Sequence, residues 1–135
     1  MTRAALLVGC LAVLACRRTS GPILAPAHVT AIGPLGDSSP GAKAEGIEIT
    51  YDECPNVTEQ IAFDSLGPTS PAMPATNVAC LRGLGVGARV DMKVTTSRNL
   101  QTAAYSLVAV GSCELPKDFE MRTRVQGDKR CAWMR

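Results

Sequence analysis

Hydrophobic and polar residues alternate along three segments of the chain, and this alternation predicts three half-buried β-strands. In the first segment, polar residues separate Ile47, Ile49 and Tyr51. Residues 89–94 and residues 119–125 repeat the pattern with valine, methionine and phenylalanine as the apolar members. Successive residues of a strand point to opposite faces, so a period of two places one face in a core and the other in water.

A fourth segment, residues 103–110, is apolar on both faces and therefore predicts a central strand of a sheet. Residues 60–66 and residues 78–84 are weaker strand candidates, and residues 97–101 are expected to connect two of the strands. No segment has the spacing of a convincing amphipathic helix. Many short strands predict an all-β fold, either a small antiparallel sandwich or a small barrel.

The segment between residues 17 and 45 differs in composition from the rest of the chain. It is rich in proline, glycine and serine and lacks a sustained hydrophobic period. All of the aromatic residues follow it, starting with Tyr51. We therefore expect a flexible tether over residues 16–45 and a folded domain over residues 46–135. The weak alternation from His28 to Ile32 is the one feature that would add an edge strand to this domain.

The first sixteen residues have the organisation of an export signal. Arg3 supplies a positive charge, residues 4–14 are apolar, and the small Ala15 precedes Cys16. The apolar stretch is too short to span a bilayer. If this is an ordinary secretory signal, the domain is released in soluble form after cleavage.

Four residues at the end of this signal resemble the lipobox of bacterial lipoproteins: Val13, Leu14, Ala15 and Cys16. The resemblance covers only the signal, and it implies removal of residues 1–15 and diacylation of the Cys16 sulfur. Val13 stands where leucine is commonest in the family. Arg17 follows where aspartate would imply retention in the inner membrane, so the outer membrane or the cell surface is favoured. The chain is expected to be exported and anchored to the cell envelope by lipid.

Four cysteines remain after the signal: Cys54, Cys80, Cys113 and Cys131. An even number of cysteines in an exported domain predicts two disulfides. Three pairings are possible, and the sequence leaves the choice open. The spacing lacks the C-x2-C pairs that are typical of zinc sites and redox-active dithiols, so neither a metal nor a cofactor is expected.

Residues for the common hydrolytic mechanisms are scarce. His28 is the only histidine and lies in the expected tether, which argues against a Ser-His-Asp or Cys-His site within the domain. The adjacent residues Asp52 and Glu53 would point to opposite faces of a strand. Asp118 and Glu120 would share a face and could serve as acid and base. A solvated charged face with cross-strand pairs is the simpler interpretation of these carboxylates.

Basic residues in the C-terminal part form the remaining candidate site. With a net charge of +2, the chain lacks the cationic excess that is typical of nucleic-acid-binding proteins. Four cations project from the water-facing sides of two predicted strands: Arg89, Lys93, Arg122 and Arg124. If these strands are neighbours, the side chains form a patch for an anionic envelope polymer, a lipid headgroup or an acidic partner protein.

Together these patterns predict a non-catalytic domain, attached to a membrane through its lipid anchor, that binds or supports another component of the envelope. Two alternatives stay open. A disulfide-held inhibitor would present the proline-spaced loop from Gly67 to Asn77 to a hydrolase. A small envelope enzyme would use the carboxylates of Asp118 and Glu120.

Overall fold

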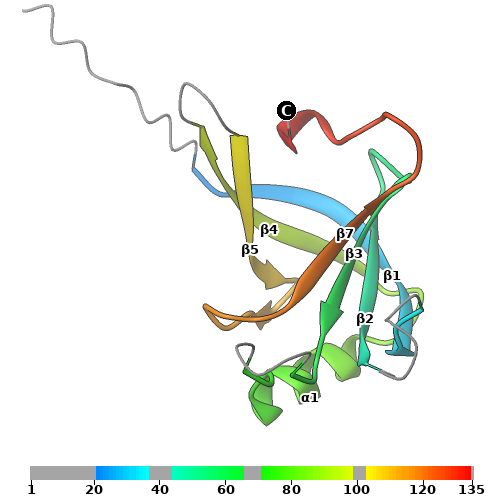
Figure 1. The fold of residues 1–135 in the computed structure, drawn as a ribbon, viewed down its shortest axis with the longest axis vertical. Coiled ribbons are helices and arrows are strands. Elements are labelled where there is room, and N and C mark those ends of the chain that lie inside the picture. Colours follow the sequence, from blue (N-terminus) through cyan, green and yellow to red (C-terminus); the bar gives the residue numbers. More distant parts are fainter. Residues whose placement is uncertain (1–20, 37–43, 66–70, 99–102, 135) are drawn as a thin grey trace, which may run out of the picture.

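The computed structural model describes residues 21–36, 44–65, 71–98 and 103–134. Over these residues the chain forms seven strands, one α-helix and one short 3-10 helix (Figure 1). In chain order the elements are β1 (Ile23–Pro34), β2 (Glu45–Tyr51), β3 (Val57–Ala62), α1 (Ala75–Leu84), β4 (Arg89–Arg98), β5 (Ala103–Val110), β6 (Cys113–Glu114), β7 (Met121–Val125) and the 3-10 helix η1 (Ala132–Met134).

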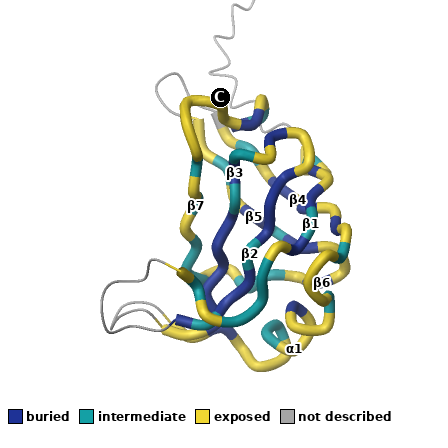
Figure 2. The backbone as a smooth tube through the Cα atoms, turned by 90° about the vertical axis from the view of Figure 1, so that its right-hand side faces the viewer, coloured by how far each residue is buried: buried dark blue, intermediate teal, exposed yellow. Residues whose placement is uncertain are grey.

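The strands form one antiparallel sheet in the order β6-β5-β4-β1-β2-β3-β7. The sheet curls into a half-barrel, with α1 near one end and η1 near the other (Figure 1). Buried residues concentrate in β2 and β3, whereas every residue of β7 is exposed or half-buried (Figure 2). The all-β prediction is confirmed, and the core lies on the concave face of a single curled sheet.

Residues 23–34 form β1, the middle strand of the sheet, so the prediction of a tether over residues 16–45 is wrong for this stretch. β1 pairs with β4 on one side and with β2 on the other. Its core-facing residues Ala25, Ala27 and Val29 are buried but small, which explains the weak hydrophobic period of the segment. The folded domain therefore begins with β1 rather than with β2.

The three strands predicted from alternation are present as β2, β4 and β7. β5 has the bounds of the fourth prediction, but it lies near one end of the sheet, beside the two-residue strand β6. Its Val108 is half-buried and lies at the irregularity in the pairing with β4, between Leu107 and Ala109, which pair with Val94 and Lys93. The weaker candidate over residues 60–66 is displaced: β3 starts earlier, at Val57, and ends at Ala62.

Residues 78–84, the other weak strand candidate, belong to the helix α1, so that prediction is wrong. Pro74 precedes the helix, and Gly85 with a φ of 79° follows it, so both ends carry residues that favour a helix boundary. The alanine, leucine and arginine residues between them favour helix over strand. Leu81 is completely buried in the core, which fixes the helix against one end of the half-barrel.

Both predicted disulfides are confirmed, and their pairing is nested: Cys54 bonds to Cys131, and Cys80 bonds to Cys113. The inner bridge connects α1 to β6. The outer bridge connects the turn between β2 and β3 to the C-terminal segment. Asn56 in the same turn donates hydrogen bonds from Nδ2 to two backbone carbonyls of that segment. The N–H of Gln126 also donates to the carbonyl of Asn56 at 2.9 Å, so one disulfide and three hydrogen bonds fix the C-terminal segment to this turn.

Gly46 in β2 marks a close approach between backbones, because an added Cβ would lie 2.2 Å from the backbone oxygen of Ile61 in β3. Replacing Gly46 with alanine should lower the free energy of unfolding by about 3 kcal/mol, since the strands must separate to relieve the overlap. The matched control is Gly83→Ala in α1, where the added Cβ meets nothing within 4 Å. Alanine is favoured over glycine in a helix by up to about 1 kcal/mol, so the control should be neutral or stabilising. Urea denaturation of both variants measures the difference, and equal stabilities would contradict the close approach.

Candidate functional site

The four cations of the predicted patch do not lie on neighbouring strands. Arg89 and Lys93 are on β4, whereas Arg122 and Arg124 are on β7, and β1, β2 and β3 lie between them. Four steps between adjacent strands correspond to about 19 Å along the sheet. The condition for a single patch is not met, and the cations form two separate pairs.

The first pair, Arg89 and Lys93, lies beside an open hollow on the outer face of β4. Leu24 of β1 is the register partner of Lys93, so these two side chains are neighbours on the same face. Leu84 at the end of α1 and Ser112 before β6 also line the hollow, which has a volume of about 520 Å³. Among the described residues neither cation forms an ion pair. Both charges are therefore available to an external anion.

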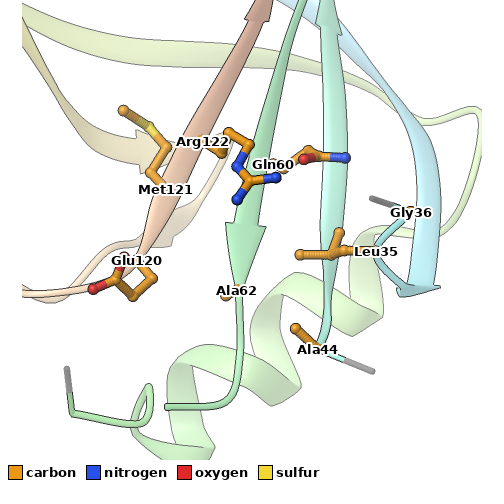
Figure 3. A pocket seen from close by; sticks show the side chains of 8 residues that line it. All are labelled: Leu35, Gly36, Ala44, Gln60, Ala62, Glu120, Met121 and Arg122. Carbon is orange, nitrogen blue, oxygen red and sulfur yellow. The ribbon is translucent and has the colours of Figure 1, made fainter. Parts of the chain in front are cut away.

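Arg122 of the second pair lines a smaller pocket beside β3, together with Glu120 and Gln60 (Figure 3). The guanidinium of Arg122 is directed toward Gln60, whose Nε2 donates a hydrogen bond to Glu48 at 2.7 Å. The pocket has a volume of about 90 Å³. Sites for small molecules usually measure roughly 300 Å³ or more, so this pocket has room for water rather than for a substrate.

The carboxylates considered for catalysis do not gather around one cavity. Oδ1 of Asp52 lies 2.8 Å from Nδ1 of His28, and both side chains are half exposed. His28 thus belongs to β1 and pairs with a carboxylate on the surface. Glu53 is exposed in the turn after β2, and Asp118 is exposed before β7. Glu120 lines the small pocket, but Asp118 does not.

The structure also assembles a buried polar cluster that the sequence analysis missed, which we call the Glu59 cluster: Glu59, Tyr51, Tyr105 and Thr123. Glu59 in β3 is fully buried on the concave face of the sheet. The hydroxyls of Tyr51 and Tyr105 lie 3.2 Å and 2.7 Å from its Oε1, and the hydroxyl of Thr123 lies 2.8 Å from its Oε2. Burial raises the pKa of Glu59, although hydrogen bonds from the three hydroxyls partly oppose this effect.

The hydrogens of the Glu59 cluster can be counted. Besides the three contacts to Glu59, the hydroxyls of Tyr105 and Thr123 lie 2.7 Å from each other. Four oxygen–oxygen contacts share only three hydroxyl hydrogens when the carboxyl is ionised. A proton on Oε2 would supply the fourth hydrogen, donated to Thr123, which would then donate to Tyr105. The geometry and the burial therefore favour the neutral carboxyl.

The Glu59 cluster joins parts of the sheet that are not paired by their backbones. Tyr105 belongs to β5, and β4, β1 and β2 separate it from β3 in the sheet order. Trp133 of η1 covers both tyrosines edge to face, with ring centroids 5.2 Å from Tyr51 and 5.0 Å from Tyr105. The cluster and η1 together hold β5 against β3 and β7 across the concave face of the half-barrel. The buried carboxyl therefore has a structural role.

No family model, curated protein or solved structure matches the chain. No helix among the described residues has the length and hydrophobicity to cross a bilayer. In the same part of the chain, no group of three or more histidine, cysteine, aspartate or glutamate residues is arranged to hold a metal ion.

The loop that an inhibitor would present is only partly described, because residues 66–70 lie outside the described ranges. Met73 is buried in the core, and its N–H donates to the carbonyl of Phe63 at 2.9 Å. Residues 75–77 form the first turn of α1. The second half of the predicted loop is therefore an integral part of the domain rather than a protruding tip.

Proposed function

We propose that the chain is an extracytoplasmic domain, anchored by lipid at Cys16 and without a catalytic role, that binds a component of the cell envelope through its surface. The two disulfides carry the first part of this proposal, because such bonds form and persist in oxidising compartments. Residues 1–15 and Cys16 lie outside the described residues, so the anchor rests on the lipobox resemblance alone.

A binding role is supported by the difference between the polar groups inside the half-barrel and those on its surface. The interior of the half-barrel is filled by apolar side chains and by the Glu59 cluster, whose hydroxyls and carboxyl satisfy one another. Arg89 and Lys93, by contrast, border an open hollow without an ion-pair partner among the described residues. This surface suits an anionic ligand, such as an acidic envelope component.

Expression of the chain with its own signal in a bacterial host tests the anchor. We expect an intact mass that corresponds to a chain beginning at acylated Cys16, and recovery of the protein with membranes. The Cys16→Ala variant should lose both the acyl mass and the membrane association. A wild-type chain that carries no acyl groups would contradict the lipid-anchored part of the proposal. Strong catalytic turnover by the purified protein would contradict the proposal that the domain has no catalytic role.

A further inference from the structure

The discovery that β1 begins at Ile23 changes where the domain would lie relative to its anchor. Only residues 17–22 separate Cys16 from β1. Even fully extended, this stretch allows at most about 25 Å between the Cα atoms of Cys16 and Ile23. As a flexible coil it would span about 15 Å. A tether this short keeps the start of β1 within reach of the headgroup layer.

The start of β1 also defines which face is nearest to the anchor. Leu24 directly follows Ile23, and its side chain is 62% exposed, on the outer face of the sheet. It is one of only two large hydrophobic residues that are exposed among the described residues, the other being Val86 at 66%. Lys93 is its register partner, so a cation and an exposed aliphatic side chain lie together where the chain leaves the domain.

The charges of this face match an anionic membrane. Arg89, Asp91 and Lys93 alternate along β4 and share its outer face. The two cations outnumber the single carboxylate, and neither forms an ion pair within the described residues. Each basic residue held near an anionic lipid surface favours contact by about fivefold. Leu24 can enter the interfacial region beside them, as amphipathic surfaces commonly do.

We infer that the face formed by Leu24, Arg89 and Lys93 is the surface on which the anchored domain rests against anionic phospholipids. The inference depends on the proposed attachment at Cys16 and specifies the envelope component that this surface contacts first. Tethering raises the local concentration of lipid at this face, so a weak intrinsic affinity is enough to orient the domain.

Fluorescence quenching tests the orientation of the domain on the membrane, in protein that is attached to lipid by chemical coupling. The chain from Cys16 onward, which contains every described residue, is coupled through the Cys16 thiol to maleimide lipid in vesicles that contain phosphatidylglycerol and nitroxide-labelled lipid. The variant Leu24→Trp is compared with Arg124→Trp, at an exposed position of β7 four strands away from β4, after subtraction of the Trp133 signal of the unsubstituted chain. We expect strong quenching of Leu24→Trp, weak quenching of Arg124→Trp, and little quenching of either in pure phosphatidylcholine.

A charge reversal separates docking from simple proximity. Lys93→Glu, added to Leu24→Trp, should lower the docked fraction by at least about fivefold, because it removes a cation and adds a repelled anion. The exposed residue Lys117 provides the control, and Lys117→Glu should leave the quenching unchanged. Equal quenching at positions 24 and 124, or insensitivity to Lys93→Glu, would overturn the inference. In this experiment chemical coupling attaches the protein to lipid, so the result does not depend on acylation in the cell. A failure of the lipid anchor itself would be seen separately, in the intact mass of the expressed protein.

Discussion

Replacing Glu59 with alanine should lower the free energy of unfolding by about 3 kcal/mol, whereas replacing it with glutamine should change it by less than about 1 kcal/mol. Alanine leaves a void and removes the acceptor of the Tyr51 hydroxyl, while Tyr105 and Thr123 can still bond to each other. Glutamine has the shape of the neutral acid, and its amide can donate to Thr123 and accept from both tyrosines. Chemical denaturation at neutral pH compares the three proteins.

The same carboxyl should make stability depend on pH in a defined direction. Burial raises the pKa of Glu59 in the folded protein, whereas a glutamate in an unfolded chain has a pKa of about 4.3. The folded protein therefore holds this proton to a higher pH. The stabilising contribution of the proton is fully present below about pH 4.3 and is lost as the pH rises through the folded pKa.

The difference between wild type and Glu59→Gln isolates this contribution from the other titrating groups. Relative to the variant, the wild-type protein should lose stability as the pH rises from about 4.3 toward the folded pKa. Glu114→Gln, at an exposed glutamate in β6, should keep the wild-type profile. If wild type and Glu59→Gln have parallel profiles over this range, Glu59 is not protonated in the folded state and the count of hydrogens around it is wrong.

Removal of the outer disulfide is expected to have the largest effect of all. Cys54 and Cys131 are separated by 77 positions, but the inner bridge shortens the loop that the outer bridge closes to about 44 positions, and a crosslink over such a loop stabilises by about 4 kcal/mol in the chain-entropy account. The double variant Cys54→Ala, Cys131→Ala should lose about this much, measured by chemical denaturation. Because η1 follows Cys131 directly, the single tryptophan of the chain, Trp133, should also become more exposed, with a red-shifted emission in the folded state.

The inner disulfide provides the matched control. Cys80 and Cys113 are separated by 33 positions, and in the chain that keeps the outer bridge the double alanine variant should lose about 3 kcal/mol, which is somewhat less. This bridge lies at α1 and β6, away from η1, and its removal should leave the emission of Trp133 unchanged. A red shift in both double variants, or in neither, would contradict the specific role of the outer bridge in holding the C-terminal segment.

The parts of the fold that could be predicted are those with strong local patterns. Alternation in β2 and β4 uses large side chains such as Ile47, Ile49 and Met92, and all three are completely buried. The number of disulfides followed from the even cysteine count, but their pairing did not, because it depends on where α1 and the C-terminal segment meet the sheet. Hydrophobic alternation predicts that a residue faces a core, but it does not predict which strands are neighbours. For the same reason, the sequence could not show that the four cations lie on strands that are far apart in the sheet.

The parts that could not be predicted have weak or conflicting local patterns. β1 carries alanines on its core face and Pro26 in its interior, and proline is normally excluded from the middle of a sheet. The Glu59 cluster was detectable in part, because Glu59 lies between Val57 and Ile61 on what would be one apolar face. The predicted strand started at Gln60, one residue too late to include it. Tyr105 reaches Glu59 only because the sheet curls, which is a tertiary property.

The central place of β1 also has a consequence for the order in which the sheet is assembled. Among the described residues β1 is the first strand to be synthesised, and it can pair early with β2, which follows closely in the chain. Its other neighbour, β4, begins 66 residues after the start of β1. Until then, the middle of the future sheet has an open edge, and open edges accept strands from other chains. Nascent copies of this protein are therefore open to exchanging β4 with one another before the sheet is complete.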